Sequence, residues 1–298
     1  MQAKVYRANI DRAKKDLMAF FNADSTDRSH WIFDYARKRP HFDKIQWHSG
    51  SMFWGHQLKV LFEDRHFHWN IGFALKQLVD EGELILMTER SQDVRKELAR
   101  LPQANINRIN LYRKKKRYYI RNTKKLLKLL NKWWDPVYFK GIGVHGESAS
   151  ELTFHRLGFK IAGRHTNEFN GIRYSQGDKN LDFILEKDNL NYGVEVKNTI
   201  GYPGYEDFKE KTFQLCDELE IIPWWISRNA PFNWNNDIKE LEGFIYRNKA
   251  IIFPPISRQL RDQIWYQTGI PITLDEALPL KIQKQMERQF EKDSEIFG

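Results

Sequence analysis

The order of hydrophobic patterns after residue 136 restricts the fold of this chain more than any other feature. Patterns typical of strands and of helices follow one another there as strand, helix, strand, strand, helix and strand. This order indicates an α/β (α+β) domain with a mixed central sheet flanked by helices. Asp135-Pro136 interrupts the helical pattern before it, so we expect two domains, residues 1–135 and 136–298.

The N-terminal region, residues 1–135, is expected to be mostly helical. Amphipathic patterns predict helices at 53–62 and 68–81, with a short polar break between them. Gly82 stands at the position of a C-terminal helix cap, and a strand is expected at 83–88.

This succession of helix, turn, helix and strand resembles a winged helix-turn-helix domain. In that family the second helix enters the major groove of DNA and the following hairpin forms the wing. The resemblance implies that Asn70 and Lys76, with His68 and Gln77, are the candidates for reading bases. A winged helix equally serves as a protein-contact or packing domain, and this alternative stays open.

Positive charge is concentrated immediately after this region. Residues 113–132 contain ten Lys and Arg residues and no acid, a block as large as the net charge of +9 for the whole chain. Five aromatic residues lie within or beside it: Tyr112, Tyr118, Tyr119, Trp133 and Trp134. The block predicts contacts with nucleic-acid phosphates, expected from Lys114, Lys115, Lys116 and Arg117. The alternative is a solvated helix face.

The C-terminal region carries acids and a lysine at strand spacing. In the run 194–197, two valines alternate with Glu195 and Lys197, so both charged side chains project from one face of a strand. A preceding strand at 181–185 contains Asp182, and pairing around a turn near residue 189 sets Asp182 roughly opposite Lys197. Two carboxylates so placed bind a divalent cation such as Mg²⁺, and a lysine beside them stabilises charge on a phosphate.

This arrangement resembles the PD-(D/E)XK nuclease superfamily, which includes restriction endonucleases and Holliday junction resolvases. The resemblance covers roughly residues 140–255 and follows the family's order of helix acid, strand, Asp hairpin, Glu-x-Lys, helix and strand. It implies that Asp182 and Glu195 ligate the metal and that Lys197 assists the nucleophile. Leu181 stands where the motif's name expects proline. After the last strand, Arg228 is expected to reach a phosphate.

The resemblance leaves two candidates for the acid on the helix. Glu147 and Glu151 are spaced i and i+4, so they share a helix face. Glu147 fits the pattern better because of its distance from the preceding glycine and from Gly158.

A rival motif overlaps this helix. Residues 141–146 read Gly-Ile-Gly-Val-His-Gly, a literal G-x-G-x-x-G of the kind found in dinucleotide-binding folds. That fingerprint also requires an acid about 20 residues further on, and residues 163–165 are Gly-Arg-His. A simpler use of these glycines is to let the backbone approach a phosphate or to let the helix pack closely.

The expected function is Mg²⁺-dependent hydrolysis of DNA phosphodiesters, with Mn²⁺ able to substitute, leaving a 5′-phosphate as the family generally does. A restriction-type endonuclease is the first choice; a structure-selective repair nuclease and a non-catalytic DNA-binding protein are the alternatives. Duplex DNA is the expected partner, and a homodimer would suit a double-strand cutter. No signal peptide, no apolar run of membrane-spanning length and a single cysteine, Cys216, predict a cytoplasmic protein.

Overall fold

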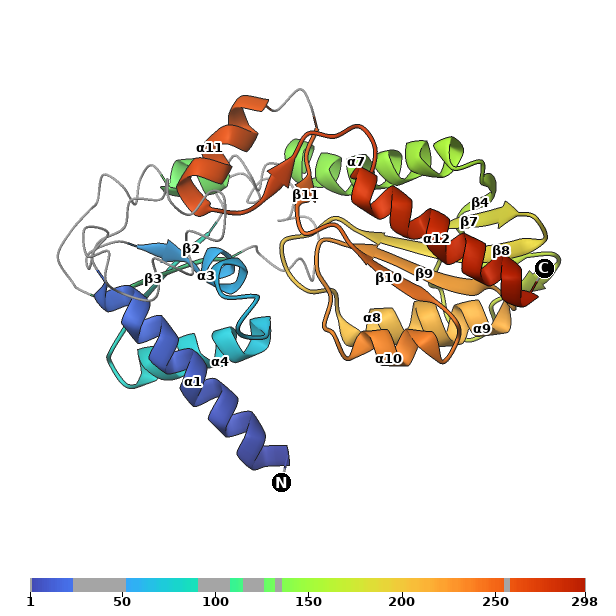
Figure 1. Ribbon diagram of the computed structural model, residues 1–298. Coiled ribbons are helices and arrows are strands. Elements are labelled where there is room, and N and C mark those ends of the chain that lie inside the picture. Colours follow the sequence, from blue (N-terminus) through green and yellow to red (C-terminus); the bar gives the residue numbers. More distant parts are fainter. Residues whose placement is uncertain are drawn as a thin grey trace. The chain divides into compact units, whose positions relative to one another are not determined.

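The protein consists of two compact units, seen here in a computed structural model (Figure 1). The structure describes residues 2–23, 52–90, 108–114, 126–131, 136–254 and 258–297. Unit 1 comprises Met1–Phe139 and Ser257–Pro271, and unit 2 comprises Lys140–Ile256 and Ile272–Gly298. The boundary expected at residue 135 lies close to the first of these junctions, whereas the return of 257–271 to unit 1 was not predicted.

Unit 1 combines helices with a three-stranded antiparallel sheet. Its elements in chain order are α1 (Gln2–Asn22), β1 (Phe53–Trp54), α3 (Gly55–Leu61), α4 (His68–Asp80), β2 (Ile85–Arg90), β3 (Arg108–Arg113), a helical segment at 126–131, and α11 (Arg258–Thr268). The sheet has the order β1-β3-β2. The predicted helix at 53–62 was wrong in its first two residues, which pair with Tyr112 and Leu111 of β3. Both side chains are buried, so helical periodicity did not distinguish them from a helix start.

The helix predicted at 68–81 is confirmed as α4, and Gly82 ends it as expected. Gly82 has φ +75°, a conformation that glycine adopts without steric cost. One face of α4 packs on α1 and α3 through a buried apolar cluster that includes Leu17, Phe20, Leu58 and Leu75. The amphipathic pattern therefore located this helix because tertiary packing buries the same stripe.

Unit 2 is built on a five-stranded mixed sheet of order β10-β9-β8-β7-β4. Strands β4, β7 and β8 pair antiparallel, while β8, β9 and β10 pair parallel. Its elements in chain order are α7 (Pro136–Arg156), β4 (Lys160–Thr166), β5 (Glu168–Phe169), β6 (Ile172–Arg173), β7 (Leu181–Lys187), β8 (Leu190–Lys197), α8 (Tyr205–Lys209), the π-helical segment η3 (Glu210–Leu215), α9 (Cys216–Glu218), β9 (Ile222–Ser227), α10 (Trp234–Lys239), β10 (Phe244–Arg247), β11 (Ile251–Ile252), β12 (Ile272–Thr273) and α12 (Leu280–Phe297). The predicted mixed sheet flanked by helices is confirmed at this level. The strand predicted at the start of this region was wrong, because residues 136–156 form the single helix α7.

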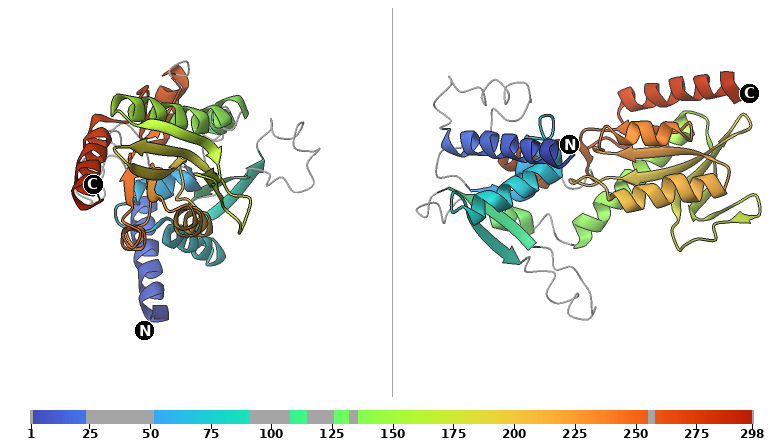
Figure 2. Two further views of the ribbon diagram at one scale, coloured as in Figure 1. Left: turned by 90° about the vertical axis from the view of Figure 1, so that its right-hand side faces the viewer. Right: turned by 90° about the horizontal axis from the view of Figure 1, so that it is seen from below.

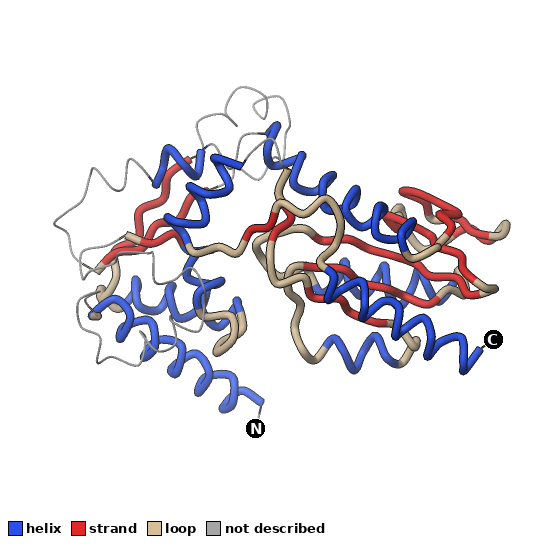
Figure 3. The backbone as a smooth tube through the Cα atoms, turned by 45° about the horizontal axis from the view of Figure 1, so that its top comes forward, coloured by secondary structure: helices blue, strands red, loops and turns tan. Residues whose placement is uncertain are grey.

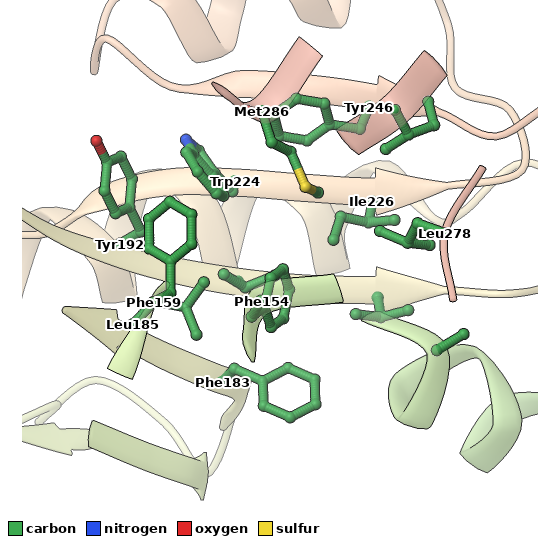
Figure 4. Close-up of a cluster of buried hydrophobic side chains, with 14 of the residues drawn as sticks. Phe154, Phe159, Phe183, Leu185, Tyr192, Trp224, Ile226, Tyr246, Leu278 and Met286 are labelled. Carbon is green, nitrogen blue, oxygen red and sulfur yellow. The ribbon is translucent and has the colours of Figure 1, made fainter. Parts of the chain in front are cut away.

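Helices cover both faces of this sheet (Figures 1 and 2). On one face, α7 and α12 pack against the strands in a cluster that contains Phe154, Trp224, Tyr246 and Met286 (Figure 4). On the other face lie α8, η3, α9 and α10, and Figure 3 shows the strands of unit 2 between the two helical layers. Because both faces of the sheet are covered, most residues of the central strands β7, β8 and β9 are buried, including the charged Glu195.

The turn between β7 and β8 is shorter than the sequence suggested. Asp188 and Asn189 alone form it, with φ values of +48° and +66°, which these two residue types tolerate better than most. The strands consequently pair up to the turn, and Phe183 lies opposite Val194. Continuing this register by one residue sets Asp182 beside Glu195, so the predicted pairing of Asp182 with Lys197 was wrong.

The G-x-G-x-x-G segment lies inside α7, so it forms no loop and the dinucleotide-binding alternative was wrong. A Cβ atom at Gly143 would meet nothing, and one at Gly141 would make ordinary contact with Pro254. A Cβ at Gly146 would stand 2.5 Å from the Cβ of Asn198. The Asn198 side chain donates to the carbonyls of Ile142 and Ile252, both at 2.7 Å, so it joins α7 to the neighbouring backbone.

We expect Gly146→Ala to lower the free energy of unfolding by about 1–3 kcal/mol, because Asn198 has no room to move without losing these hydrogen bonds. Gly143→Ala is the matched control in the same helix. It should leave stability unchanged or raise it by up to about 1 kcal/mol, since alanine favours a helix over glycine. Urea unfolding of both variants measures the difference, and equal stabilities would contradict this account of the packing.

Candidate metal centre

Three side chains from three different elements converge beside the sheet. They are Glu147 of α7, His165 of β4 and Asp182 of β7, and one potential ligand atom from each lies within 4.8 Å of the other two. His165 Nε2 is 3.5 Å from a Glu147 carboxylate oxygen, and His165 Nδ1 is 4.0 Å from Asp182 Oδ1. Two carboxylates and an imidazole at this spacing form a candidate site for a metal ion.

A β-bulge in β4 brings His165 to this position. The pairing with β7 shifts by one residue between Ile161 and Gly163, which leaves Ala162 as the extra residue. Beyond the shift, the paired residues are Arg164 with Phe183 and Thr166 with Leu181. His165 therefore lies beside Asp182, the residue between Phe183 and Leu181.

Sequence reasoning missed His165. His165 belongs to β4, which continues to Thr166. His165 has φ +46°, an uncommon conformation for a residue in a strand. Alternation in the sequence counts residues in steps of two, so it places a side chain beyond a bulge on the wrong face.

Asp182 is largely buried at the centre of the group. Its Oδ2 accepts a hydrogen bond from the backbone N–H of Val196 at 2.7 Å, which connects the two strands of the hairpin. Burial raises the pKa of Asp182 and the nearby Glu147 acts in the same direction, whereas the Val196 N–H acts against this shift. The site therefore holds a carboxylate whose negative charge is only partly compensated.

Glu195 is the most deeply buried acid of the site, with 2% of its surface exposed. Its Oε1 forms an ion pair with Lys197, and its Oε2 accepts a hydrogen bond from Lys211 Nζ at 2.6 Å. Burial, followed by the like charge of Asp182, raises the pKa of Glu195 to about 7 despite the two lysines. Both carboxylate oxygens therefore face ammonium groups.

Lys197 occupies the position that the sequence predicted, on the same strand face as Glu195. Its Nζ also lies 3.0 Å from Asp207 Oδ2, an acid in the first turn of α8. Burial alone would lower the pKa of Lys197, but the carboxylates of Glu195 and Asp207 raise it above its ordinary value. Lys197 is thus held as a cation between two acids.

Lys211 belongs to the π-helical segment η3 rather than to a regular helix. Lys211 is buried and paired with Glu195. π-Helical turns are rare and occur frequently at functional sites, and this one delivers a second cation to the Glu195 carboxylate.

The two candidates for the helix acid have different surroundings. Both carboxylate oxygens of Glu151 accept hydrogen bonds from the guanidinium group of Arg164, in a bidentate ion pair. His155 Nε2 lies 3.6 Å from Glu151 Oε1. Glu147 instead points to His165 and Asp182. The geometry therefore places Glu147, and not Glu151, in the group of side chains that could hold a metal ion.

Three of the residues predicted to contact nucleic acid are placed differently. Arg228 is buried and its Nε and Nη2 donate to the carbonyl of Ile200 at 3.0 and 2.7 Å, so this prediction was wrong. Asn70 is also buried, on the core side of α4, and cannot read a base edge there. Lys114 is half-buried and its Nζ donates to Asn22.

Lys76, Lys115, Lys116 and Arg117 were also predicted to contact nucleic acid, and the structure describes only the first of them. Lys76 lies exposed on α4, as a contact residue requires. The predictions for Lys115, Lys116 and Arg117 fall outside the described residues. Among the helices that the structure describes, none combines the length and apolar composition needed to cross a membrane.

Comparisons with known proteins add no family assignment. No protein-family model matches the chain, and no curated protein or solved structure matches it either. The chemistry of the site therefore has to be argued from its own residues.

The raised pKa of Asp182 predicts how a variant without this charge should behave. When the pKa of an acid is higher in the folded state than in the unfolded state, its contribution to stability is fully present below the unfolded-state pKa. This contribution is lost as the pH rises through the folded-state pKa. Asp182→Asn removes the buried charge and keeps an oxygen for the Val196 N–H. Without metal, we expect it to be more stable than the wild type at pH 7 and equally stable at pH 3. Urea unfolding in the presence of a chelator measures both; a less stable variant at pH 7 would contradict the prediction.

Proposed function

We propose that this protein is a metal-dependent DNA endonuclease of the PD-(D/E)XK type. The observation that carries the proposal is the grouping of Glu147, Asp182, Glu195 and Lys197 around one end of the β7–β8 hairpin. Phosphodiester hydrolysis needs acids that hold a divalent cation and a cation that stabilises charge on the phosphate. This set supplies both.

The topology of unit 2 supports the proposal. Helix α7, strands β4, β7 and β8, the helical segment 205–218 and strand β9 follow one another in the order expected from the resemblance. The antiparallel β4-β7-β8 pairing continues into the parallel neighbour β9, so both acid-bearing strands lie inside the sheet. A rigid sheet holds catalytic groups more accurately than loops do.

The residues of the group divide the work in this proposal between holding the metal and assisting the attack on the phosphate. Glu147 and Asp182 present oxygens toward one point, where a bound Mg²⁺ would neutralise charge on the scissile phosphate. Lys197 stands next to Glu195 at the end of β8, and its ammonium is suited to orient the attacking water and to stabilise charge that develops on the phosphate. Asp207 holds Lys197 in this position through its 3.0 Å ion pair.

Unit 1 supports DNA as the substrate. Its elements run α1, β1, α3, α4, β2, β3 with the sheet order β1-β3-β2, an arrangement similar to a winged helix. Helix α4 corresponds to the reading helix and carries the exposed Lys76. A reading unit joined to a cleaving unit suits sequence-targeted cutting, so we propose a restriction-type enzyme.

Incubation with supercoiled plasmid and Mg²⁺ tests the proposal. Wild-type protein should produce discrete linear fragments, while Asp182→Ala and Glu147→Gln should reduce cleavage by at least about a hundredfold and still bind DNA. Glu151→Gln is the matched control, one helical turn from Glu147, and should cut normally. Activity in Asp182→Ala would exclude this site. Cutting of branched DNA alone would favour a structure-selective nuclease, and no cutting of any nucleic acid would favour a binding protein.

A second prediction concerns the basic segment. Replacing Lys115, Lys116 and Arg117 with glutamate should weaken DNA binding at all sequences, because these residues are proposed to neutralise phosphates. The slope of log affinity against log salt should fall by about one unit for each phosphate that the protein no longer neutralises. Fluorescence anisotropy at several salt concentrations measures it, and an unchanged slope would assign phosphate binding to other residues.

A further inference from the structure

We propose that His165 is the third protein ligand of the metal and that the site therefore prefers a first-row transition ion such as Mn²⁺ to Mg²⁺. This inference rests on the proposed metal-dependent function and concerns which ion that function uses. The resemblance to the nuclease superfamily implies carboxylate ligands and did not point to a histidine.

The distances favour coordination by the imidazole. Two ligands bound at adjacent positions of one ion, each at about 2.1 Å, lie roughly 3 Å apart. The two imidazole nitrogens face different acids: His165 Nε2 lies 3.5 Å from Glu147, and Nδ1 lies 4.0 Å from Asp182. One potential ligand atom from each of the three side chains lies within 4.8 Å of the other two. Rotation of the exposed imidazole and side-chain shifts of about 2 Å would therefore bring one nitrogen and both carboxylates onto a common ion.

The partners of the Glu195 carboxylate strengthen the assignment of His165 as a ligand. Both of its carboxylate oxygens are paired with lysines, Oε1 with Lys197 and Oε2 with Lys211, and its side chain is almost fully buried. The three donors grouped by distance are Glu147, His165 and Asp182, without Glu195. His165 thus takes the place that a second hairpin carboxylate would otherwise fill.

The mixture of donors determines which ion fits. Mg²⁺ prefers oxygen ligands and retains several waters, whereas imidazole nitrogen is a better ligand for first-row transition metals. A neutral nitrogen in place of a third carboxylate also leaves less negative charge to hold a hard cation. Mn²⁺ accepts both nitrogen and carboxylate oxygen, and it is the ion we use as a probe.

Electron paramagnetic resonance of the full-length protein loaded with Mn²⁺ tests the inference without measuring cleavage. Electron spin-echo modulation should show one directly bound histidine nitrogen, and labelling the histidines with ¹⁵N should change that pattern. His165→Asn should abolish the nitrogen coupling and weaken Mn²⁺ binding by at least about tenfold. Asparagine tolerates the positive φ at this position, so the variant should fold normally.

His155→Asn is the matched control, because His155 contacts Glu151 and does not belong to the group of Glu147, His165 and Asp182. It should retain the nitrogen coupling and the affinity for Mn²⁺. Competition with Mg²⁺ gives a second measurement: the preference for Mn²⁺ over Mg²⁺ should shrink in His165→Asn and stay unchanged in His155→Asn.

The outcomes separate this inference from the proposed function. Mn²⁺ bound without nitrogen coupling in the wild type, or with coupling that persists in His165→Asn, would overturn the role of His165 and leave a carboxylate-bound nuclease metal intact. Absence of Mn²⁺ binding together with absence of plasmid cleavage would overturn both. Nitrogen coupling that disappears only in His165→Asn would support the inference even if the DNA substrate were still unidentified.

Discussion

The burial of the Glu195 carboxylate is the constraint on which unit 2 depends. Strand β8 is paired on both sides, by β7 and by β9, so a charge on it has no access to water from the sheet edge. An unpaired carboxylate there would cost several kcal/mol. Two lysines offset this cost, one from the same strand and one from η3. Asp207 in turn balances Lys197, so the charges form a connected group from the sheet to the helix beside it.

This group explains local features that otherwise look irregular. The π-helical segment Glu210–Leu215 has more residues per turn than a regular α-helix, so it changes the directions in which the side chains of residues 205–218 point. That segment is where Lys211 reaches Glu195. The bulge in β4 performs a similar task on the other side, because it sets His165 beside Asp182. Both irregularities lie next to the acids, as expected where function requires a departure from regular geometry.

The accuracy of the sequence-based predictions follows from the range of the interactions involved. Helix α4 and its glycine cap were predicted because they depend on a local pattern of apolar residues and on one backbone conformation. The pairing of Asp182 was mispredicted because the turn at Asp188 and Asn189 is two residues long, and turn length sets the register of the whole hairpin. The basic residue Arg228 was misread because burial against the Ile200 carbonyl has no signature in the neighbouring sequence.

The sequence by itself determined the placement of Glu195 and Lys197 on one strand face, since a strand alternates with a period of two. The order of helix α7, strands β4, β7 and β8, the helical segment 205–218 and strand β9 was likewise predicted, whereas the strand expected before α7 was not found, because its residues belong to that helix. The sequence also narrowed the helix acid to two residues one turn apart. Only the tertiary structure decided between these two residues. Arg164 on strand β4 forms an ion pair with Glu151, whereas Glu147 faces Asp182. The entry of His165 and Lys211 into the site was likewise decided in three dimensions. A bulge and a π-turn each shift side-chain directions by one residue, and packing between distant segments selects these shifts.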